Sequence, residues 1–175
     1  MDTHRRTFLE LSAEVTGYGE GDLEGTGLVD DYQALVAQQV GSGVMTQLHD
    51  AARRVLRHDG EKAREAAMRV DILASPILWP VVSSLIQLWY TGSWSSMTAG
   101  WYALARVAVP AGVTAGHAFV PSMESYIQQL AYRGAGAHPP GANPTGFGSW
   151  SIPPVFGDVM PPQATRASRG GAKAG

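Results

Sequence analysis

The middle of the chain carries no charged side chain, since no Asp, Glu, Lys or Arg occurs in residues 72–105. A helix that is apolar on all sides lies in a bilayer, in a core or in an interface. The apolar run at residues 77–90 is shorter than the ~20 residues that cross a bilayer. Pro76, Pro80 and Gln87 also interrupt the pattern. We therefore predict a largely buried helix over residues 74–90 and no membrane span.

Local signals place the ends of this central helix. Ser75 followed by Pro76 is typical of an N-cap and a first helical position, where proline's missing N–H costs nothing. Pro80 is expected to kink or delay the helix, and Gly92 to end it.

Apolar residues recur at helical spacing in much of the remaining chain. Gly17, the glycines at 41 and 43, Gly60 and Gly134 interrupt or end these patterns, and Ser122 is placed to cap the last one. Residues 93–121 predict only short elements. The fold class that follows is all-α, a small irregular helical bundle with an extended Gly/Pro-rich C-terminal arm. The helical segments are residues 8–16, 28–39, 44–55, 61–73 and 122–131.

The composition changes after this bundle. Of the chain's 21 glycines and 11 prolines, 16 lie in residues 134–175, too many for a core. Large apolar residues such as Phe147 and Trp150 nevertheless occur there, which a disordered linker normally lacks. We predict a helical bundle domain over residues 1–135, an extended partner-binding arm over 136–156 and a disordered tail over 157–175.

Several function classes find no support in the sequence. The 13 Lys and Arg nearly balance the 15 Asp and Glu, so nucleic acid is not an expected partner. The chain has no cysteine, and none of its five histidines lies three or four residues from another. The basic residues at 53–69 alternate with acidic ones, which is typical of a solvated helical face. Asp30 and Asp31 diverge around a helix. We find no catalytic constellation, which favours binding or a structural role.

Two motifs near the ends of the predicted bundle are more specific. QLWYTG occupies residues 87–92, while ESY at 124–126 precedes GAHPPG at 136–141 and PTGFGSW at 144–150. FLELS at 8–12 and TGY at 16–18 add weaker matches. Over most of residues 8–154 the chain resembles the small (gamma) subunit of FAD-dependent sorbitol, gluconate, fructose and glucose dehydrogenase complexes.

The resemblance implies a non-catalytic accessory subunit without a cofactor. In that family FAD sits in a large glucose-methanol-choline-type subunit, often with a multiheme cytochrome c as a third member. The small subunit there is commonly exported by its own twin-arginine signal. Here Arg5-Arg6 precedes Glu10 and Glu14, where an apolar segment would be needed. We therefore expect a cytoplasmic location, the alternative being the periplasm if an export signal was removed or the partner carries one.

The arm and the end of the central helix are the expected contacts with the large subunit, because proline restricts the backbone in advance and Trp and Tyr anchor interfaces. An alternative is that Phe147 and Trp150 pack on the chain's own helices. Two other functions stay open: a small-ligand-binding helical protein using Trp89, Trp94 and Trp101, and an enzyme with an unrecognised site. The predicted interface residues are Trp89, Tyr90, His138, Pro139, Pro140, Phe147, Trp150, Pro153 and Pro154.

Overall fold

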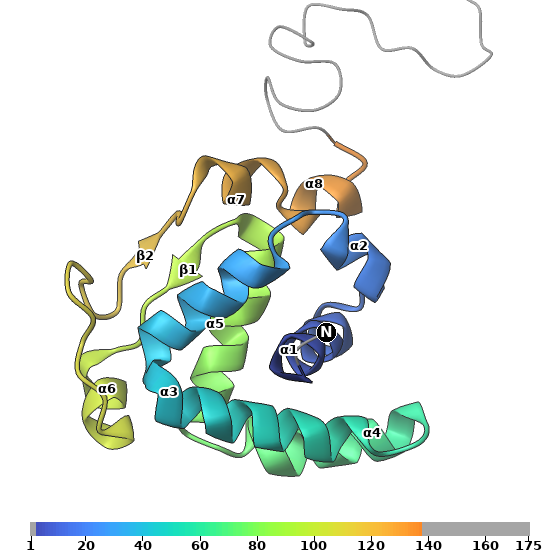
Figure 1. Ribbon diagram of the computed structural model, residues 1–175, viewed down its shortest axis with the longest axis horizontal. Coiled ribbons are helices and arrows are strands. Elements are labelled where there is room, and N and C mark those ends of the chain that lie inside the picture. Colours follow the sequence, from blue (N-terminus) through green and yellow to red (C-terminus); the bar gives the residue numbers. More distant parts are fainter. Residues whose placement is uncertain (1–2, 138–175) are drawn as a thin grey trace, which may run out of the picture.

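A computed structural model describes residues 3–137 of the chain. Figure 1 shows helices arranged around α5, with a short strand pair on one side. The all-α prediction is confirmed, since a single two-residue strand pair is the only sheet within the described residues. The elements are α1 (Thr3–Thr16), α2 (Glu20–Glu24), α3 (Val29–Leu56), α4 (Glu61–Met68), η1 (Arg69–Leu73), α5 (Leu78–Thr91), β1 (Trp94–Ser95), α6 (Ala99–Ala105), β2 (Ala118–Phe119), α7 (Met123–Ile127) and α8 (Leu130–Gly134).

The first helix follows its predicted apolar stripe. Phe8 and Leu11 are buried and Val15 is half-buried against the core. Gly17 follows the helix at φ +74°, a left-handed conformation that glycine adopts without strain. The predicted helix stop is therefore where the sequence places it.

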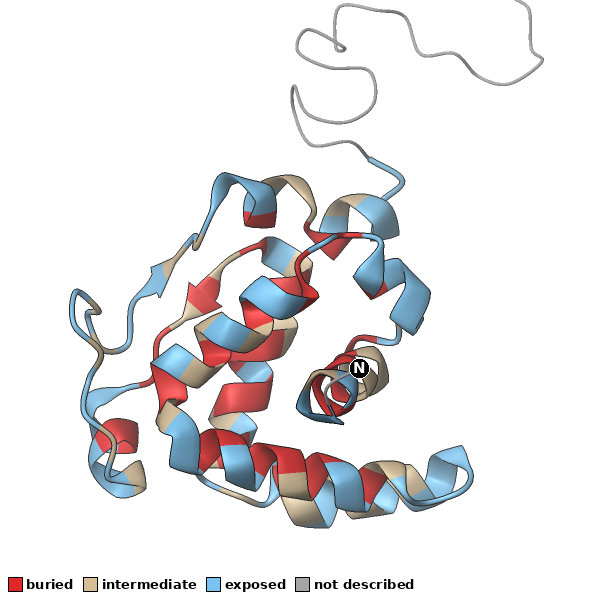
Figure 2. Cartoon of the chain, in the orientation of Figure 1, coloured by how far each residue is buried: buried red, intermediate tan, exposed pale blue. Residues whose placement is uncertain are grey.

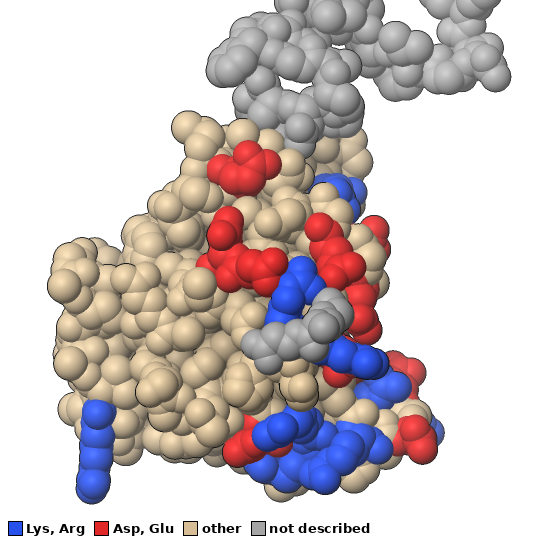
Figure 3. Space-filling model, viewed as in Figure 1, with Lys and Arg blue, Asp and Glu red and all other residues tan. Residues whose placement is uncertain are grey.

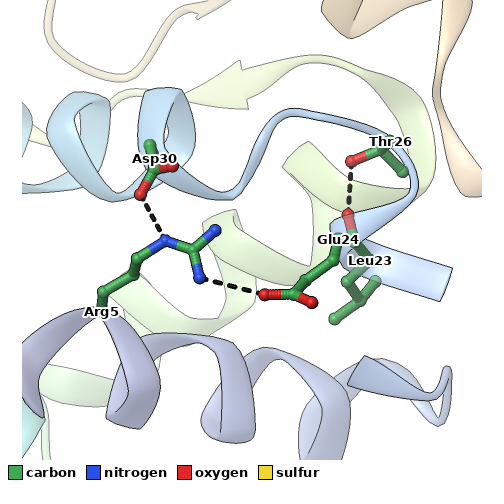
Figure 4. Close-up of polar contacts among 5 residues, drawn as sticks. All are labelled: Arg5, Leu23, Glu24, Thr26 and Asp30. Carbon is green, nitrogen blue, oxygen red and sulfur yellow. Dashed lines mark hydrogen bonds and ion pairs between the residues drawn. The ribbon is translucent and has the colours of Figure 1, made fainter. Parts of the chain in front are cut away.

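An arginine ties α1 to the next two elements. Nε of Arg5 donates to Asp30 at 2.6 Å, and Nη1 donates to Glu24 at 3.0 Å (Figure 4). In the same view the Thr26 hydroxyl donates to the carbonyl of Leu23 at 2.6 Å and closes the turn after α2. The hydrogen bond with Asp30, followed by that with Glu24, raises the pKa of the Arg5 guanidinium. The N-terminal end of α3 is thus held against α1.

The two helices predicted at residues 28–39 and 44–55 form one element, α3. Gly41 lies inside it at φ 78° and ψ 159°, which is not helical, so the chain turns sharply but does not form a loop (Figure 1). Tyr32, Val36 and Val40 are buried before the kink, and Leu48 and Val55 after it. The kink lets both halves of α3 face the core.

The predicted helix at 61–73 is confirmed, but its last turn is wider than an α-helix. α4 runs directly into η1, a π-helical turn, in which Ile72 is fully buried while Val70 is 75% exposed. Single π-helical turns occur often at functional sites.

The central helix α5 begins at Leu78, two residues after the first helical position predicted at Pro76, although Ser75 still binds its first turn. The Ser75 hydroxyl accepts hydrogen bonds from the backbone N–H groups of Ile77 at 3.3 Å and Leu78 at 3.1 Å. Pro80 lies in the first turn of α5, so the structure shows the delayed start that was one of the two effects expected of Pro80. Leu85 and Leu88 are fully buried, which confirms a largely buried helix. It contacts α1, α3, η1, β1, α7 and α8.

Residues 93–121 contain the short elements expected there. β1 and β2 pair antiparallel, with Trp94 opposite Phe119 and Ser95 opposite Ala118. Between them α6 is capped by Thr98, whose hydroxyl accepts from the backbone N–H of Trp101 at 3.2 Å.

The prediction of one continuous helix at 122–131 is wrong. Ser122 does cap α7, accepting from the N–H of Ser125 at 3.0 Å, but Gln129 is extended at ψ 138° and separates α7 from α8. Met123 is 74% exposed, and Leu130 is fully buried. Both α7 and α8 contact α5, on either side of the extended Gln129.

Buried residues line the facing sides of α1, α3 and α5 (Figure 2). Within residues 3–137 no single helix has the length and apolar character to cross a membrane. The segments 61–73 and 78–91 pass that test only as a pair, and they are bent by 112° relative to each other.

Candidate functional site

The structure corrects one predicted interface residue. Trp89 is 1% exposed and packs edge-on against Tyr32, with ring centroids 4.7 Å apart. A partner could not reach this side chain, so Trp89 is a core residue. The prediction failed because a helix that is apolar on every side does not reveal which aromatic faces outward.

Tyr90, the neighbouring predicted contact, is half-buried. Its hydroxyl donates to the carbonyl of Thr16 at 2.7 Å, and its ring lies 6.0 Å from that of Tyr18. Tyr90 therefore joins α5 to the end of α1. The other seven predicted contacts, at 138, 139, 140, 147, 150, 153 and 154, lie outside the described residues and stay predictions.

The three tryptophans of the small-ligand alternative are buried. Trp94 is 0% and Trp101 5% exposed. The indole N–H of Trp101 donates to the carbonyl of Ile77 at 2.9 Å. Together with Trp89 these side chains fill the core, and none of them lines the three surface hollows described next.

A first hollow, of about 620 Å³, lies between α1 and the second half of α3 and is rich in arginine. Arg6 pairs with Glu10 at 2.7 Å, and Arg54 pairs with Asp71 at 2.8 Å. Arg53 pairs with Asp50. These carboxylates largely neutralise the basic side chains that gather there in Figure 3, which agrees with the predicted solvated face.

A second hollow, of about 610 Å³, has an apolar floor. Trp79 on α5 is 43% exposed and Leu73 on η1 is 42% exposed beside it. A third hollow, of about 540 Å³, surrounds Gly17 and Tyr18 and shares Glu14 with the second. The sequence does not single out Trp79, because its helix is apolar on all sides.

One side of the molecule is nearly without charge. Figure 3 shows few Lys, Arg, Asp or Glu atoms over α6 and the strand pair. Leu104 is 55% exposed, Val109 43%, Val120 51% and Met123 74%. They come from α6, the loop after it, the residue that follows β2 and the start of α7, and we call this set of four residues the apolar face. The sequence contained its signal, since Arg106 is the only Asp, Glu, Lys or Arg in residues 72–123.

Burial and hydrogen bonding change the acidity of three tyrosines. Burial raises the pKa of Tyr32 to about 12, an effect that the Ser125 hydroxyl partly offsets. A hydrogen bond with Tyr126 raises the pKa of Tyr132 to about 12. Burial also raises the pKa of Tyr102. All three phenols are therefore neutral at neutral pH. Among residues 3–137 no group of three or more His, Asp or Glu side chains is placed to hold a metal ion.

The described residues thus form an all-α bundle with an apolar face and an apolar hollow as its most distinctive surfaces. No family model matches the chain, and neither a curated protein nor a solved structure matches it.

Proposed function

We propose that this chain is a non-catalytic accessory subunit that binds a large FAD-dependent sugar or polyol dehydrogenase and stabilises it or helps it mature. The motifs at 87–92, 124–126 and 136–150 suggest this partner. The observation that supports a binding role is the apolar face, in which the side chains of Leu104 and Met123 are each more than half exposed to solvent. Exposed apolar surface of this kind marks interaction sites, and the buried centres of interfaces are poor in charge.

In this proposal the large subunit covers the apolar face and also contacts the arm at residues 136–156. FAD belongs to the large subunit, a cytochrome c subunit is a further candidate member, and the complex is cytoplasmic. The periplasm is the alternative location, and fractionation of the native cells distinguishes the two.

The test is purification of the tagged full-length chain from its native cells, followed by measurement of mass and visible absorbance. The proposal expects a large partner with the yellow absorbance of a flavoprotein. A colourless chain that carries only a small ligand would instead support the ligand-binding alternative. Turnover by the isolated chain would support an unrecognised enzyme and contradict the proposal.

Matched variants locate the interface. Leu104→Asp and Met123→Asp place a charge on the apolar face, and each is expected to abolish capture of the flavoprotein because an unpaired carboxylate would be desolvated. Val70→Asp is the control, since Val70 is 75% exposed on η1 and is not one of the four residues of the apolar face. It should bind as the parent does. Equal capture by all three variants, with unchanged thermal melting, would refute this interface.

A further inference from the structure

The second hollow is a groove between three elements. Val15 comes from α1, Met68 and Leu73 from α4 and η1, and Trp79 and Ile86 from α5. Val15, Met68 and Ile86 are only partly buried by the core, and Trp79 and Leu73 keep about two-fifths of their surface in water. Such side chains gain free energy when another apolar group covers them. We call this hollow the α1–α5 groove.

The edge of the groove is acidic. Glu14, Glu61 and Glu65 line it, whereas Arg69 is its only lining cation. Arg69 pairs with Glu65 at 2.6 Å, and Arg64 pairs with Glu14 at 3.0 Å. Within residues 3–137, Glu61 makes no salt bridge with Lys or Arg. An occupant with apolar side chains and nearby positive charge fits this lining.

The last described helix, α8, packs on α5 and on Tyr18, which lines the neighbouring third hollow. The Tyr18 hydroxyl donates to the carbonyl of Leu130 at 3.3 Å, so α8 lies on the Tyr18–Tyr90 pair. Ile86 precedes Tyr90 by about one turn of α5. The third hollow, which includes Tyr18, adjoins the groove at Glu14. A segment that leaves α8 therefore starts near the third hollow, which borders the groove.

The sequence that follows has the required composition. Residues 138–157 contain no Asp, Glu, Lys or Arg but include Phe147, Trp150 and Phe156. Beyond them Asp158 is outnumbered by Arg166, Arg169 and Lys173. Ten extended residues after Ala137 span about 33 Å. The groove from Ile86 to Trp79 is only about 10 Å long. The segment is therefore long enough to reach the groove, and the basic residues after it complement the groove's acidic edge.

We propose that, in the free chain, the apolar segment at residues 147–156 occupies the α1–α5 groove, with the basic residues at 166–173 towards the acidic edge. Tethering makes this association intramolecular, so it needs no new partner and competes at high effective concentration. The inference goes beyond the proposed function and does not depend on it, because it concerns the subunit before any partner binds. When the large subunit is present, the arm leaves the groove and binds the large subunit instead.

The chain's lack of cysteine allows a direct test. A nitroxide on Ser151→Cys of the full-length chain would be the only thiol label. We expect it to remove most of the NMR methyl intensity of Leu73 and Ile86, while Leu104 and Val120 on the apolar face keep theirs. Leu73→Asp should restore the Ile86 signal. In a second arm, the double variant Trp150→Ala, Phe156→Ala should restore both groove signals without changing the folded groove.

Mixing identifies the other occupants. In this control, chain that carries the nitroxide but no NMR isotope is mixed with isotope-labelled chain that has no nitroxide. The groove signals of the isotope-labelled chain should stay intact. Broadening in that mixture would show that a second copy fills the groove and would overturn the proposal. Undiminished signals of Leu73 and Ile86 in the isotope-labelled chain that carries its own nitroxide would also overturn the proposal. The occupant of the groove would then be a different protein. Neither result bears on capture of the flavoprotein, so this test and that of the proposed function fail separately.

Discussion

Replacing Gly92 with alanine would test how closely α7 packs on the end of α5. Gly92 ends α5 in a left-handed conformation, at φ 64° and ψ 15°. A Cβ atom built there would lie 2.2 Å from the carbonyl oxygen of Ser125 and 3.0 Å from Cα of Tyr126. Because these neighbours are backbone atoms, α7 would have to move.

Two costs add at this position. The left-handed conformation costs alanine roughly 1–2 kcal/mol. Forcing extra volume against packed neighbours costs about 1–3 kcal/mol more. We therefore expect Gly92→Ala to lower the free energy of unfolding by about 2–5 kcal/mol, a large share of the ~5–15 kcal/mol typical of a domain.

Gly27→Ala is the matched control. Gly27 has φ +73°, but a Cβ atom there would meet nothing within 4 Å, so only the conformational cost of roughly 1–2 kcal/mol applies. Alanine restricts the unfolded chain equally in both variants, and that effect cancels in the comparison. Urea unfolding followed by circular dichroism measures both. If the two variants lose equal stability, the close contact between Gly92 and α7 does not exist as described.

Three smaller perturbations test other parts of the fold. The pKa of Tyr32 is raised to about 12, so its neutral form stabilises the fold fully below pH 10 and this contribution is lost as pH rises from 10 to 12. Tyr32→Phe should flatten that loss, roughly 3 kcal/mol, in pH-dependent urea unfolding, and an unchanged slope would contradict it. Arg5→Gln should lower the melting temperature at low ionic strength by an amount that high salt reduces, because its carboxylate partners are exposed; a difference independent of salt would argue against the bridge. Trp101→Phe removes both the indole donor to Ile77 and the buried pyrrole part of the ring, and should cost more than the ~1 kcal/mol of the hydrogen bond alone in the same unfolding assay; no loss would contradict this buried hydrogen bond.

Local chemistry in the sequence predicts much of the helical pattern. Ser122 caps α7, the Ser75 hydroxyl binds the N–H groups at the start of α5, and Gly17 and Gly92 end their helices. These signals work because a cap depends on residues only two or three positions away. The candidate surfaces were harder to predict. The scarcity of charged residues in residues 72–123 predicts an apolar region, but it does not predict which of its side chains remain exposed to solvent.

Tertiary packing decided which of the apolar side chains are buried and which are exposed. Within one apolar helix Trp89 is buried against Tyr32 and Trp79 is left half in water, because α3 covers one side of α5 and the groove leaves another open. Gly41 interrupts the helical pattern in the sequence, yet whether it makes a loop or a kink depends on both halves of α3 finding the same core. The sequence by itself determined several helix ends, such as the ends at Gly17 and Gly92 and the start at Ser122, since caps act over a few residues. Which faces are buried depends on contacts between residues far apart in the chain, and only the tertiary structure decides them.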